Sequence, residues 1–477
     1  MMTNNFNFAP DEASLEALVR EGLRDGGQWC DLYFENTEYS ELLLRDSVVS
    51  SGGCHTDCGC GIRVLCGEKT GYAYSQTLDM ASLLAAARSA GSIAVCPSAA
   101  SPSLNVSAAP RRNIPEISPE RYGMQRDWRD QKASLMVPAL ERIETEIRRR
   151  ESRTEKVIAM LSSSVSEVLM YNSLGELTRD CRPLGSISVT VIFRNGKAVE
   201  QKSVSRSLRT GADLLSEEVL LDIARRATTG VDEMFEASRP KGGKMSVVMG
   251  AGASGILLHE AMGHAFEADF NRKGQSIFSD AMGTRICRPG INIVDDGTLP
   301  SSRGSINYDD EGVPSQKTYM VTDGVLTSYL HDRISAAFYG VAPTGNGRRE
   351  SFRYNPIPRM RTTYMESGAD GTREDLIGSV HKGIYVDEFA NGQVKIGEGD
   401  FTFYVKSGFL IEGGRLTRPI KDINIIGNGP RALADIRAVA GDLKVDEGTW
   451  TCGKEQSVAV SCGIPTVLID NLTVGGQ

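Results

Sequence analysis

Hydrophobic side chains recur at helical spacing in several stretches of the first half of the chain. Leu15, Leu18 and Leu23 fall on one face of a helix that we expect over residues 12–25. The same period predicts further helices over residues 83–93, 131–156 and 214–229. Acidic and basic residues alternate along the third of these helices, which indicates a solvated outer face.

Alternating hydrophobic and polar residues predict strands between these helices. The strands expected in the first half cover residues 32–35, 42–49, 58–66, 157–171 and 186–194. Beyond residue 243 short strands separated by glycines dominate, and they are expected at residues 245–249, 392–402 and 409–419. One apolar helix after the first of these strands carries two histidines. The second half is therefore predicted to be β-rich with few helices.

The flexible, polar segment at 238–243, Ser-Arg-Pro-Lys-Gly-Gly, is the best candidate for a domain boundary. We expect an α+β protein with an N-terminal mixed α/β domain at 1–237 and a β-rich C-terminal domain at 238–477 that carries the histidine-bearing helix. A stretch rich in Ser, Ala and Pro at 94–119 would split the first domain further.

Charge and composition exclude several classes of partner. The formal charge of −8 argues against direct nucleic-acid binding, which needs clustered Lys and Arg. Residues 1–10 contain no basic patch followed by an apolar run, and no apolar stretch is long enough to span a bilayer. We therefore expect a cytoplasmic protein with no membrane association. In that reducing compartment its ten cysteines are expected to be buried thiols or metal ligands rather than disulfides.

The histidine-bearing helix contains a metal-binding pattern. Two of the five histidines, His259 and His264, flank Glu260 in the run His-Glu-Ala-Met-Gly-His. In zinc hydrolases two such imidazoles bind the metal and the Glu polarises water. A spacing of four residues returns to within about 40° of the start of a helix, whereas five overshoots to about 140°. Gly263 is well placed to allow the bulge or helix end that both rings need to reach one ion.

Zinc also needs a third protein ligand and one open position for water. Two histidines with unrelated roles are the simpler alternative, but an unpaired Glu260 among apolar neighbours would be costly. The residues alone do not choose among the candidates for the third ligand, which are Glu267, Asp269, Cys287, His331, Cys452 and Cys462.

Two further patterns have structural explanations that we prefer. The G-x-G-x-x-G run at 250–255 has the context of a dinucleotide-binding turn, but no acidic-ended return strand follows it. A tight turn that lets the helix pack on the sheet explains the run. Cys54, Cys58 and Cys60 resemble a second metal cluster, yet Cys58 and Cys60 continue a strand's apolar alternation as small buried side chains.

Many ordered motifs of this chain resemble the TldD family, within the wider TldD/TldE (PmbA) group. The motifs in the second half are at residues 257–267 (LLHEAMGHAFE), 269–272, 294–297, 309–314, 343–351, 392–394, 452–454 and 470–476. The likeness is looser in the first half, where residues 61–64 and 71–75 match best. The cysteine-rich strand at 54–66 departs from the family pattern, which leaves the metal motif intact.

The resemblance implies a zinc metallopeptidase with an HExxxH motif and a distant cysteine as third ligand. Carried over to this sequence, the zinc ligands are His259, His264 and Cys452, and the base is Glu260. It also implies a partner: a TldE/PmbA-like subunit that lacks the motif and forms a heterodimer, or a second copy of this chain in a homodimer. Such complexes are associated with cleavage of unfolded or leader-type peptides, and some members are described as indirect modulators of DNA gyrase.

Two segments are candidates for contact with a peptide substrate. The loop at 345–353 combines glycines with Arg348 and Arg349, and could donate to a developing oxyanion, although structural ion pairs would also explain these arginines. Gly392, Gln393 and Val394 lie in an expected strand that could bind extended substrate through its main chain. The main rival function is a non-catalytic, zinc-stabilised interaction protein, which would need a fourth protein ligand.

Overall fold

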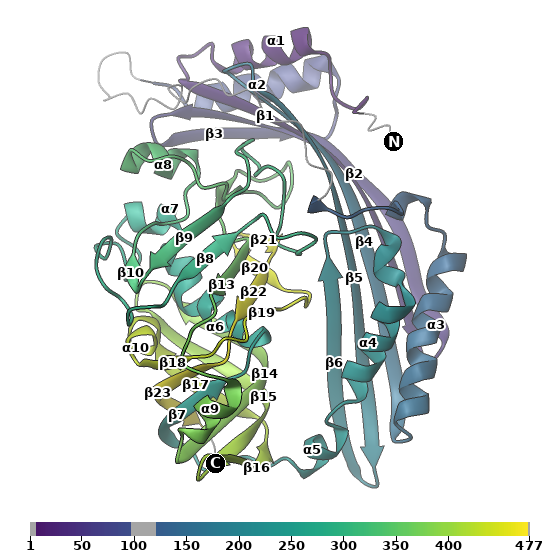
Figure 1. The fold of residues 1–477 in the computed structure, drawn as a ribbon. Helices are drawn as coiled ribbons and strands as arrows, with labels where there is room; N and C mark the ends of the chain where they lie inside the picture. Colours follow the sequence, from purple (N-terminus) through teal and green to yellow (C-terminus); the bar gives the residue numbers. More distant parts are fainter. Residues whose placement is uncertain (1–5, 97–120, 476–477) are drawn as a thin grey trace.

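The computed structural model describes residues 6–96 and 121–475, and its N-terminal half is built on one long antiparallel sheet (Figure 1). The strand order is β3-β2-β1-β4-β5-β6. The strands are β1 (Trp29–Arg45), β2 (Val48–Cys66), β3 (Lys69–Ser75), β4 (Thr154–Asn172), β5 (Leu177–Asn195) and β6 (Ala198–Leu208). Strands from both sides of the predicted linker at 94–119 share this sheet, and most of that linker lies outside the described residues.

Helices cover one face of this sheet because its strands present alternate apolar side chains there. On β5, Ile187, Val189 and Val191 are buried in a core with helices α3 and α4. Each such side chain contributes about 1.5–3 kcal/mol when it is fully buried. The helices are α1 (Glu12–Gly22), α2 (Met80–Ile93), α3 (Ala133–Arg150), α4 (Glu217–Thr228) and the short α5 (Val231–Glu236).

A ring of strands forms the lower part of the C-terminal half. The order β14-β7-β23-β17-β15 closes through a further β14–β15 pairing. Its strands are β7 (Gly243–Met249), β14 (Lys382–Lys395), β15 (Asp400–Glu412), β17 (Ile423–Asn428) and β23 (Val467–Gly475), with β16 (Arg415–Ile420) beside β15 and β18 (Ile436–Val439) beside β23. The closure pairs the first and last strands of this order with each other.

A second sheet packs next to this ring and shares its hydrophobic core. Its order is β10-β9-β8-β13-β22-β19. The strands are β8 (Ile293–Asp296), β9 (Lys317–Thr322), β10 (Val325–Leu326), β13 (Thr362–Met365), β19 (Lys444–Val445) and β22 (Ser461–Ile464). Two hairpins accompany it, namely β11 (Gly347–Arg348) with β12 (Ile357–Pro358) and β20 (Thr451–Lys454) with β21 (Gln456–Ala459). The remaining helices are α6 (Ile256–Leu258), α7 (Ala268–Arg272), α8 (Arg333–Tyr339), α9 (Arg373–Gly378) and α10 (Gly429–Ala434).

These elements confirm the predicted α+β class with a β-rich C-terminal half. One helix prediction is too long: the helix expected over 131–156 ends at Arg150, and strand β4 already begins at Thr154. The chain turns there because Glu151 is extended and its carboxylate accepts hydrogen bonds from Arg153. Strands 32–35 and 42–49 are parts of the single strand β1 up to Arg45, and β6 has no counterpart in the predictions. The domain boundary near residue 238 stays a prediction.

None of the helices in the described part of the chain is both long and apolar enough to cross a bilayer.

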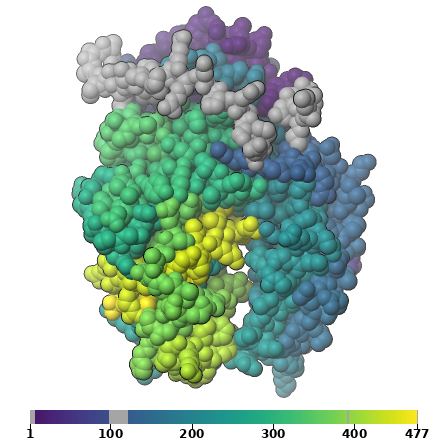
Figure 2. All heavy atoms as spheres, viewed as in Figure 1, coloured from purple at the N-terminus to yellow at the C-terminus, as the bar shows by residue number. Residues whose placement is uncertain are grey.

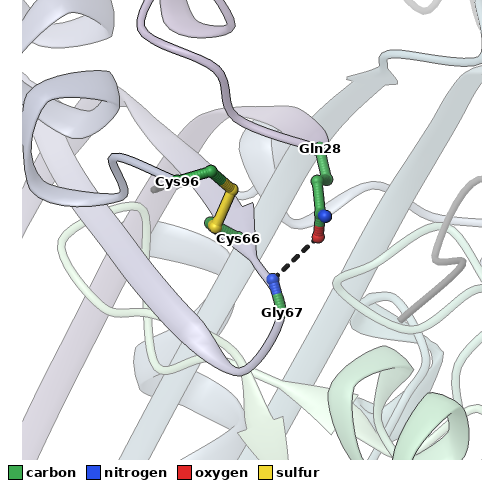
Figure 3. The surroundings of a disulfide bond; sticks show 4 residues. All are labelled: Gln28, Cys66, Gly67 and Cys96. Carbon is green, nitrogen blue, oxygen red and sulfur yellow. Dashed lines mark hydrogen bonds between the residues drawn. A yellow bond between two sulfur atoms is a disulfide. The ribbon is translucent and has the colours of Figure 1, made fainter. Parts of the chain in front are cut away.

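One pair of cysteines is joined, contrary to the expectation of free thiols. Cys66 ends β2 and Cys96 follows α2, and the packing of α2 on β2 and β3 brings them together as a disulfide (Figure 3). Next to it, the Gly67 N–H donates to the Gln28 side chain at 2.8 Å. The prediction is wrong for this pair because cysteines 30 residues apart become neighbours only through tertiary packing. The other eight cysteines are free.

We predict that Cys96→Ser lowers the free energy of unfolding of the N-terminal region by about 3–4 kcal/mol. The disulfide closes a loop of roughly 30 residues in the unfolded chain, so its loss increases the entropy of that state. Urea unfolding without reductant measures the change. Cys54→Ser, at an exposed free cysteine, is the control and should unfold like the wild type. Identical wild-type curves with and without dithiothreitol would contradict the prediction.

Candidate metal centre

The chain segment that carries both histidines is a helix with a π-helical turn. Strand β7 leads through the turn at 250–255 into α6, then into a π-helical turn over His259–Gly263 and a 3-10 turn over His264–Phe266. The His264 N–H donates to the carbonyl oxygen of His259, five residues earlier. A π-turn adds one residue to the turn, so residue i+5 returns over residue i. This confirms the expected distortion of the helix.

Glycines permit this turn because backbone and side chains approach it closely. A Cβ on Gly263 would collide with the sulfur of Met360. A Cβ on Gly255 would lie 2.5 Å from the Gly463 nitrogen on β22, and one on Gly250 would lie 2.5 Å from the Tyr385 hydroxyl. The glycines at 250–255 therefore fit the structural explanation, a tight turn that packs the helix against β22.

The helix and the hairpin β20–β21 bring three metal-ligating side chains together. The ligand atoms of His259, His264 and Cys452 all lie within 4.8 Å of one another. The Cys452 Sγ lies 3.2 Å from the His264 Nε2, and the two imidazole rings are 5.2 Å apart with an interplanar angle of 82°. All three side chains are buried, with at most 4% of their surface exposed. Cys452 is 188 residues from His264 in sequence.

The chemistry of these three side chains fits zinc. Neither ring nitrogen of the buried His259 has a hydrogen-bond partner among the described residues. Burying an imidazole without partners is costly unless a ligand satisfies it. Burial alone would raise the pKa of the Cys452 thiol, but the neighbouring His259 and His264 lower it to about 4. A thiolate with two imidazoles is a zinc donor set that leaves a fourth position open.

Glu267, a candidate for the third ligand, contacts a ligand instead of joining the group. It lies outside the three-residue group, and its Oε2 is 2.9 Å from the His264 Nδ1. Burial alone would raise the pKa of Glu267, but Lys454 and His264 lower it to about 2. The Glu267 carboxylate therefore accepts a hydrogen bond from the Nδ1–H of His264. The Nε2 atom of His264 then carries no hydrogen and faces the Cys452 sulfur.

The other candidate ligands do not join the group. His259, His264 and Cys452 form the one His/Cys/Asp/Glu cluster of metal-binding geometry found within residues 6–96 and 121–475. The candidates outside it are Glu267, Asp269, Cys287, His331 and Cys462, as well as Cys54, Cys58 and Cys60 of β2. Cys462 is fully buried on β22, and burial raises the pKa of its thiol well above the usual value.

Glu260 lies within the π-turn, next to His259, and is half-buried. Within the described part of the chain its carboxylate makes no hydrogen bond or ion pair. The carboxylate that follows the first histidine is thus free to accept a proton from a molecule bound beside the cluster.

The predicted substrate-binding arginines lie inside the protein. Arg348 donates to the main-chain oxygens of Met360 and Ala459. Arg349 donates to the Asp310 main-chain oxygen at 3.1 Å, and its guanidinium lies 4.3 Å from the centre of the Tyr33 ring. Both arginines thus have structural contacts, and of the two Arg349 forms an ion pair among the described residues, with Asp31 at 3.5 Å. A direct role in substrate binding stays a prediction.

Gly392, Gln393 and Val394 lie on a strand with one open edge. Residues 383–386 of β14 pair with both β7 and β15, whereas the partner of residues 388–395 among the described strands is β15. The partner strand β7 has left the sheet at this point to enter the metal-bearing helix, which packs against β14. The open edge of β14 therefore begins where the chain after β7 enters the metal-bearing helix.

A cleft of about 700 Å³ separates the N-terminal sheet from the C-terminal half, and an opening between them is visible in Figure 2. One wall comes from β6 and α4, and includes Lys202 and Arg226. The opposite wall includes Ala251 before the metal-bearing helix, Glu388 on β14 and Trp450, two residues before Cys452. The sequence carried no signal for this cleft, because the segments that form its walls meet only in the folded chain.

The comparisons with known proteins agree with a metal-dependent peptidase class for this fold and site. Family models of the PmbA/TldA metallopeptidase match at residues 30–94 (domain 1), 126–232 (central domain) and 242–476 (C-terminal domain). The chain belongs to the PmbA/TldD family of metallopeptidases.

Two relatives cover nearly the whole chain, and a third covers part of it. A metalloprotease TldD homologue of Haemophilus influenzae is 39% identical over 94% of this chain and 93% of its own length. One from Buchnera aphidicola (subsp. Acyrthosiphon pisum) is 35% identical over 99% of this chain and 97% of its own length. A zinc metalloprotease TldD homologue of Saccharolobus solfataricus is 31% identical over 61% of this chain and 65% of its own length.

Solved structures share the fold at lower identity. A candidate modulator of DNA gyrase from Thermotoga maritima superposes with a TM-score of 0.77 at 21% identity, covering 97% of this chain and 99% of its own. TldE from Thermococcus kodakarensis gives a TM-score of 0.72 at 20% identity, covering 97% and 100%.

We predict that Gly263→Ala destabilises the protein by about 1–3 kcal/mol and weakens zinc binding. The added methyl group meets the Met360 sulfur and displaces the π-turn that presents His264. Urea unfolding and zinc titration against a chelator measure the two effects. Gly378→Ala is the control, because a Cβ there meets no atom within 4 Å.

A Met360→Ala background tests the cause. In that background Gly263→Ala should cost less, because the colliding sulfur is gone. Additive effects of the two substitutions would show that the contact is not responsible.

Proposed function

We propose that this chain is a zinc-dependent peptidase that hydrolyses unfolded or leader-type peptides. In this proposal His259, His264 and Cys452 hold zinc, and Glu260 activates water. The convergence of two histidines and a cysteine carries the proposal, together with the adjacent Glu260, whose carboxylate has no partner among the described residues. The relative named a zinc metalloprotease supports zinc as the metal.

Bound zinc would polarise the scissile carbonyl and make a water molecule more acidic. The protein's own residues do the rest. Glu260 accepts the proton of the attacking water and later passes it to the leaving amine. Glu267 keeps His264 in the tautomer that presents Nε2. Burial of all three ligands excludes bulk water from their side of the site.

The open edge of β14 supports a binding mode for the substrate. An extended peptide that pairs with residues 388–395 would enter through the cleft and lie along the strand that packs on the metal-bearing helix. Gly392, Gln393 and Val394 would contribute main-chain groups, which suits a peptidase with little dependence on side-chain sequence. Since only unfolded chain can add to an edge as a strand, folded proteins would be poor substrates.

The oxyanion donor in this proposal comes from the loop at 345–353. The guanidiniums of Arg348 and Arg349 already donate within the protein, and so do the main-chain N–H groups of Gly347 and Arg349. A donor from this loop would therefore have to exchange one of these hydrogen bonds. The alternative function, a non-catalytic zinc-stabilised interaction protein, requires a closed site. The three-residue group among the described residues favours an open position over that alternative.

We further propose that the chain works as a dimer in the cytoplasm, either with a TldE/PmbA-like subunit or with a second copy of itself. The similarity to TldE from Thermococcus kodakarensis supports a related subunit of the same fold. An effect on DNA gyrase would be indirect, because the net charge of −8 gives no basis for DNA binding.

We predict that Glu260→Gln retains zinc and the fold but lowers peptide cleavage by at least about 100-fold, the usual contribution of a general base. Cleavage of an unfolded casein or a leader-type peptide, with and without a TldE-like partner, measures the loss. Glu374→Gln, on the exposed side of α9, is the matched control. Equal cleavage by Glu260→Gln would assign the base to another residue.

We predict that Cys452→Ser empties the zinc site and abolishes cleavage, whereas Cys462→Ser retains both. A neutral hydroxyl is a poor substitute for the thiolate that faces His264. Cys462 lies outside the cluster, so its substitution should cost only packing stability. Elemental analysis of zinc after gel filtration measures the result. Loss of zinc from Cys462→Ser alone would refute the placement of the third ligand.

A further inference from the structure

Lys454 is a buried lysine that contacts the metal centre without belonging to it. It follows Cys452 by two residues on β20, so both side chains point to the same buried face of the strand. Its Nζ donates to Glu267 Oε2 at 3.0 Å, to Asp269 Oδ1 at 2.8 Å and to the Pro358 carbonyl at 3.1 Å. These acceptors use all three ammonium hydrogens.

Lys454 and His264 contact the same oxygen atom of Glu267. Glu267 Oε2 lies 2.9 Å from the His264 Nδ1 and also accepts from Lys454. The ammonium therefore acts on the oxygen that orients the imidazole. Lys454 also lies 4.3 Å from the centre of the Phe270 ring, which restricts its position further.

The same contacts join the two chain segments that supply ligands. His264 and Glu267 come from the metal-bearing helix and its end, whereas Cys452 and Lys454 come from β20. Arg359 also contacts the β20 main chain and donates to the Cys452 carbonyl at 2.6 Å. The side-chain bridge from Lys454 to Glu267 thus connects the strand with the thiolate to the helix with the imidazole.

The charges of this group compensate one another. Glu267 and Asp269 are acidic, Lys454 and Arg359 are basic, and the Arg359 Nε lies 3.9 Å from the free oxygen of Glu267. Balanced charge lets Glu267 remain an acceptor-only carboxylate in the interior. A displaced Glu267 could no longer fix the tautomer of His264.

We propose that Lys454 is a positioning residue that acts through Glu267 to hold the His264 Nε2 toward the metal and to set its separation from Cys452. This inference rests on the proposed function and concerns the affinity of its metal site. Carboxylates that orient metal-ligating histidines typically account for about 10–100-fold in metal affinity. Lys454 differs from such carboxylates because it touches no ligand directly.

The test compares Lys454→Met, Glu267→Gln and the double variant with the full-length wild type. Zinc affinity is measured by competition with a chelator. Cobalt substitution reports the thiolate–metal charge-transfer band, and histidine-selective ¹⁵N NMR of the metal-free protein reports the tautomer of His264. Lys317→Met is the matched control, because Lys317 also pairs with a carboxylate and lies over aromatic rings, but on β9.

We expect Lys454→Met and Glu267→Gln each to weaken zinc binding by about 10–100-fold and to shift the His264 tautomer signal. The double variant should be no weaker than the worse single variant, because both substitutions break one chain of contacts. Lys317→Met should bind zinc like the wild type. Additive losses in the double variant would overturn the claim that Lys454 acts through Glu267.

A purely structural role would give a different result. Lys454→Met would then lower the thermal midpoint while zinc affinity, cobalt spectrum and tautomer remained those of the wild type, which would overturn the proposal. If Lys454→Met does not fold, Lys454→Gln, which removes the ammonium group but keeps a polar side chain, is measured in the same way and decided by the same outcomes. Failure of the wild type to bind zinc would instead refute the proposed function. If the wild type binds zinc and cleaves peptide, and the variants bind zinc equally well, only this inference is refuted.

Discussion

The π-turn between His259 and His264 is the constraint on which the rest of the metal centre depends. Five residues of regular helix would separate the two imidazoles by about 140°, and no side-chain rotation could direct both at one ion. The extra residue in the turn brings His264 back over His259, as its hydrogen bond to the His259 carbonyl shows. Glu260 lies next to His259 in this turn, and its carboxylate makes no hydrogen bond or ion pair with the residues that the structure describes. Close packing of Met360 on Gly263 holds the turn in place.

Buried ion pairs join the two halves of the chain. Arg63 of β2 pairs with Asp31 at 2.6 Å and, across to the C-terminal half, with Glu311 at 2.7 Å. Arg182 of β5 likewise pairs with Asp310 at 2.6 Å. All these groups are buried, so breaking one pair would strand an uncompensated charge in the interior. This ionic interface fixes the N-terminal sheet against the C-terminal half and leaves the cleft open farther along β6.

Sequence patterns predicted much of the fold because each helix or strand buries one face. The alternation in β5 and the period of α1 are properties of a few consecutive residues, and both elements form where they were expected. The predicted end of the charged helix was too late in the sequence, because the Arg and Glu residues near 150–156 suit a helix and the start of a strand equally well. The Cys66–Cys96 disulfide and the cleft could not be predicted, because they depend on segments that meet only in the folded chain.

The sequence by itself determined the chemistry of the helix: His259, Glu260 and His264 at a spacing that requires a distorted turn, with a glycine to permit it. That conclusion needs only helix geometry, which is local. Tertiary structure decided which distant side chains complete the site. Cys452 and Cys462 are each followed by glycine and lie ten residues apart, yet β20 turns the first toward His264 and β22 buries the second elsewhere. Lys454 and Glu267 likewise meet only because hairpin and helix pack together, 187 residues apart in sequence.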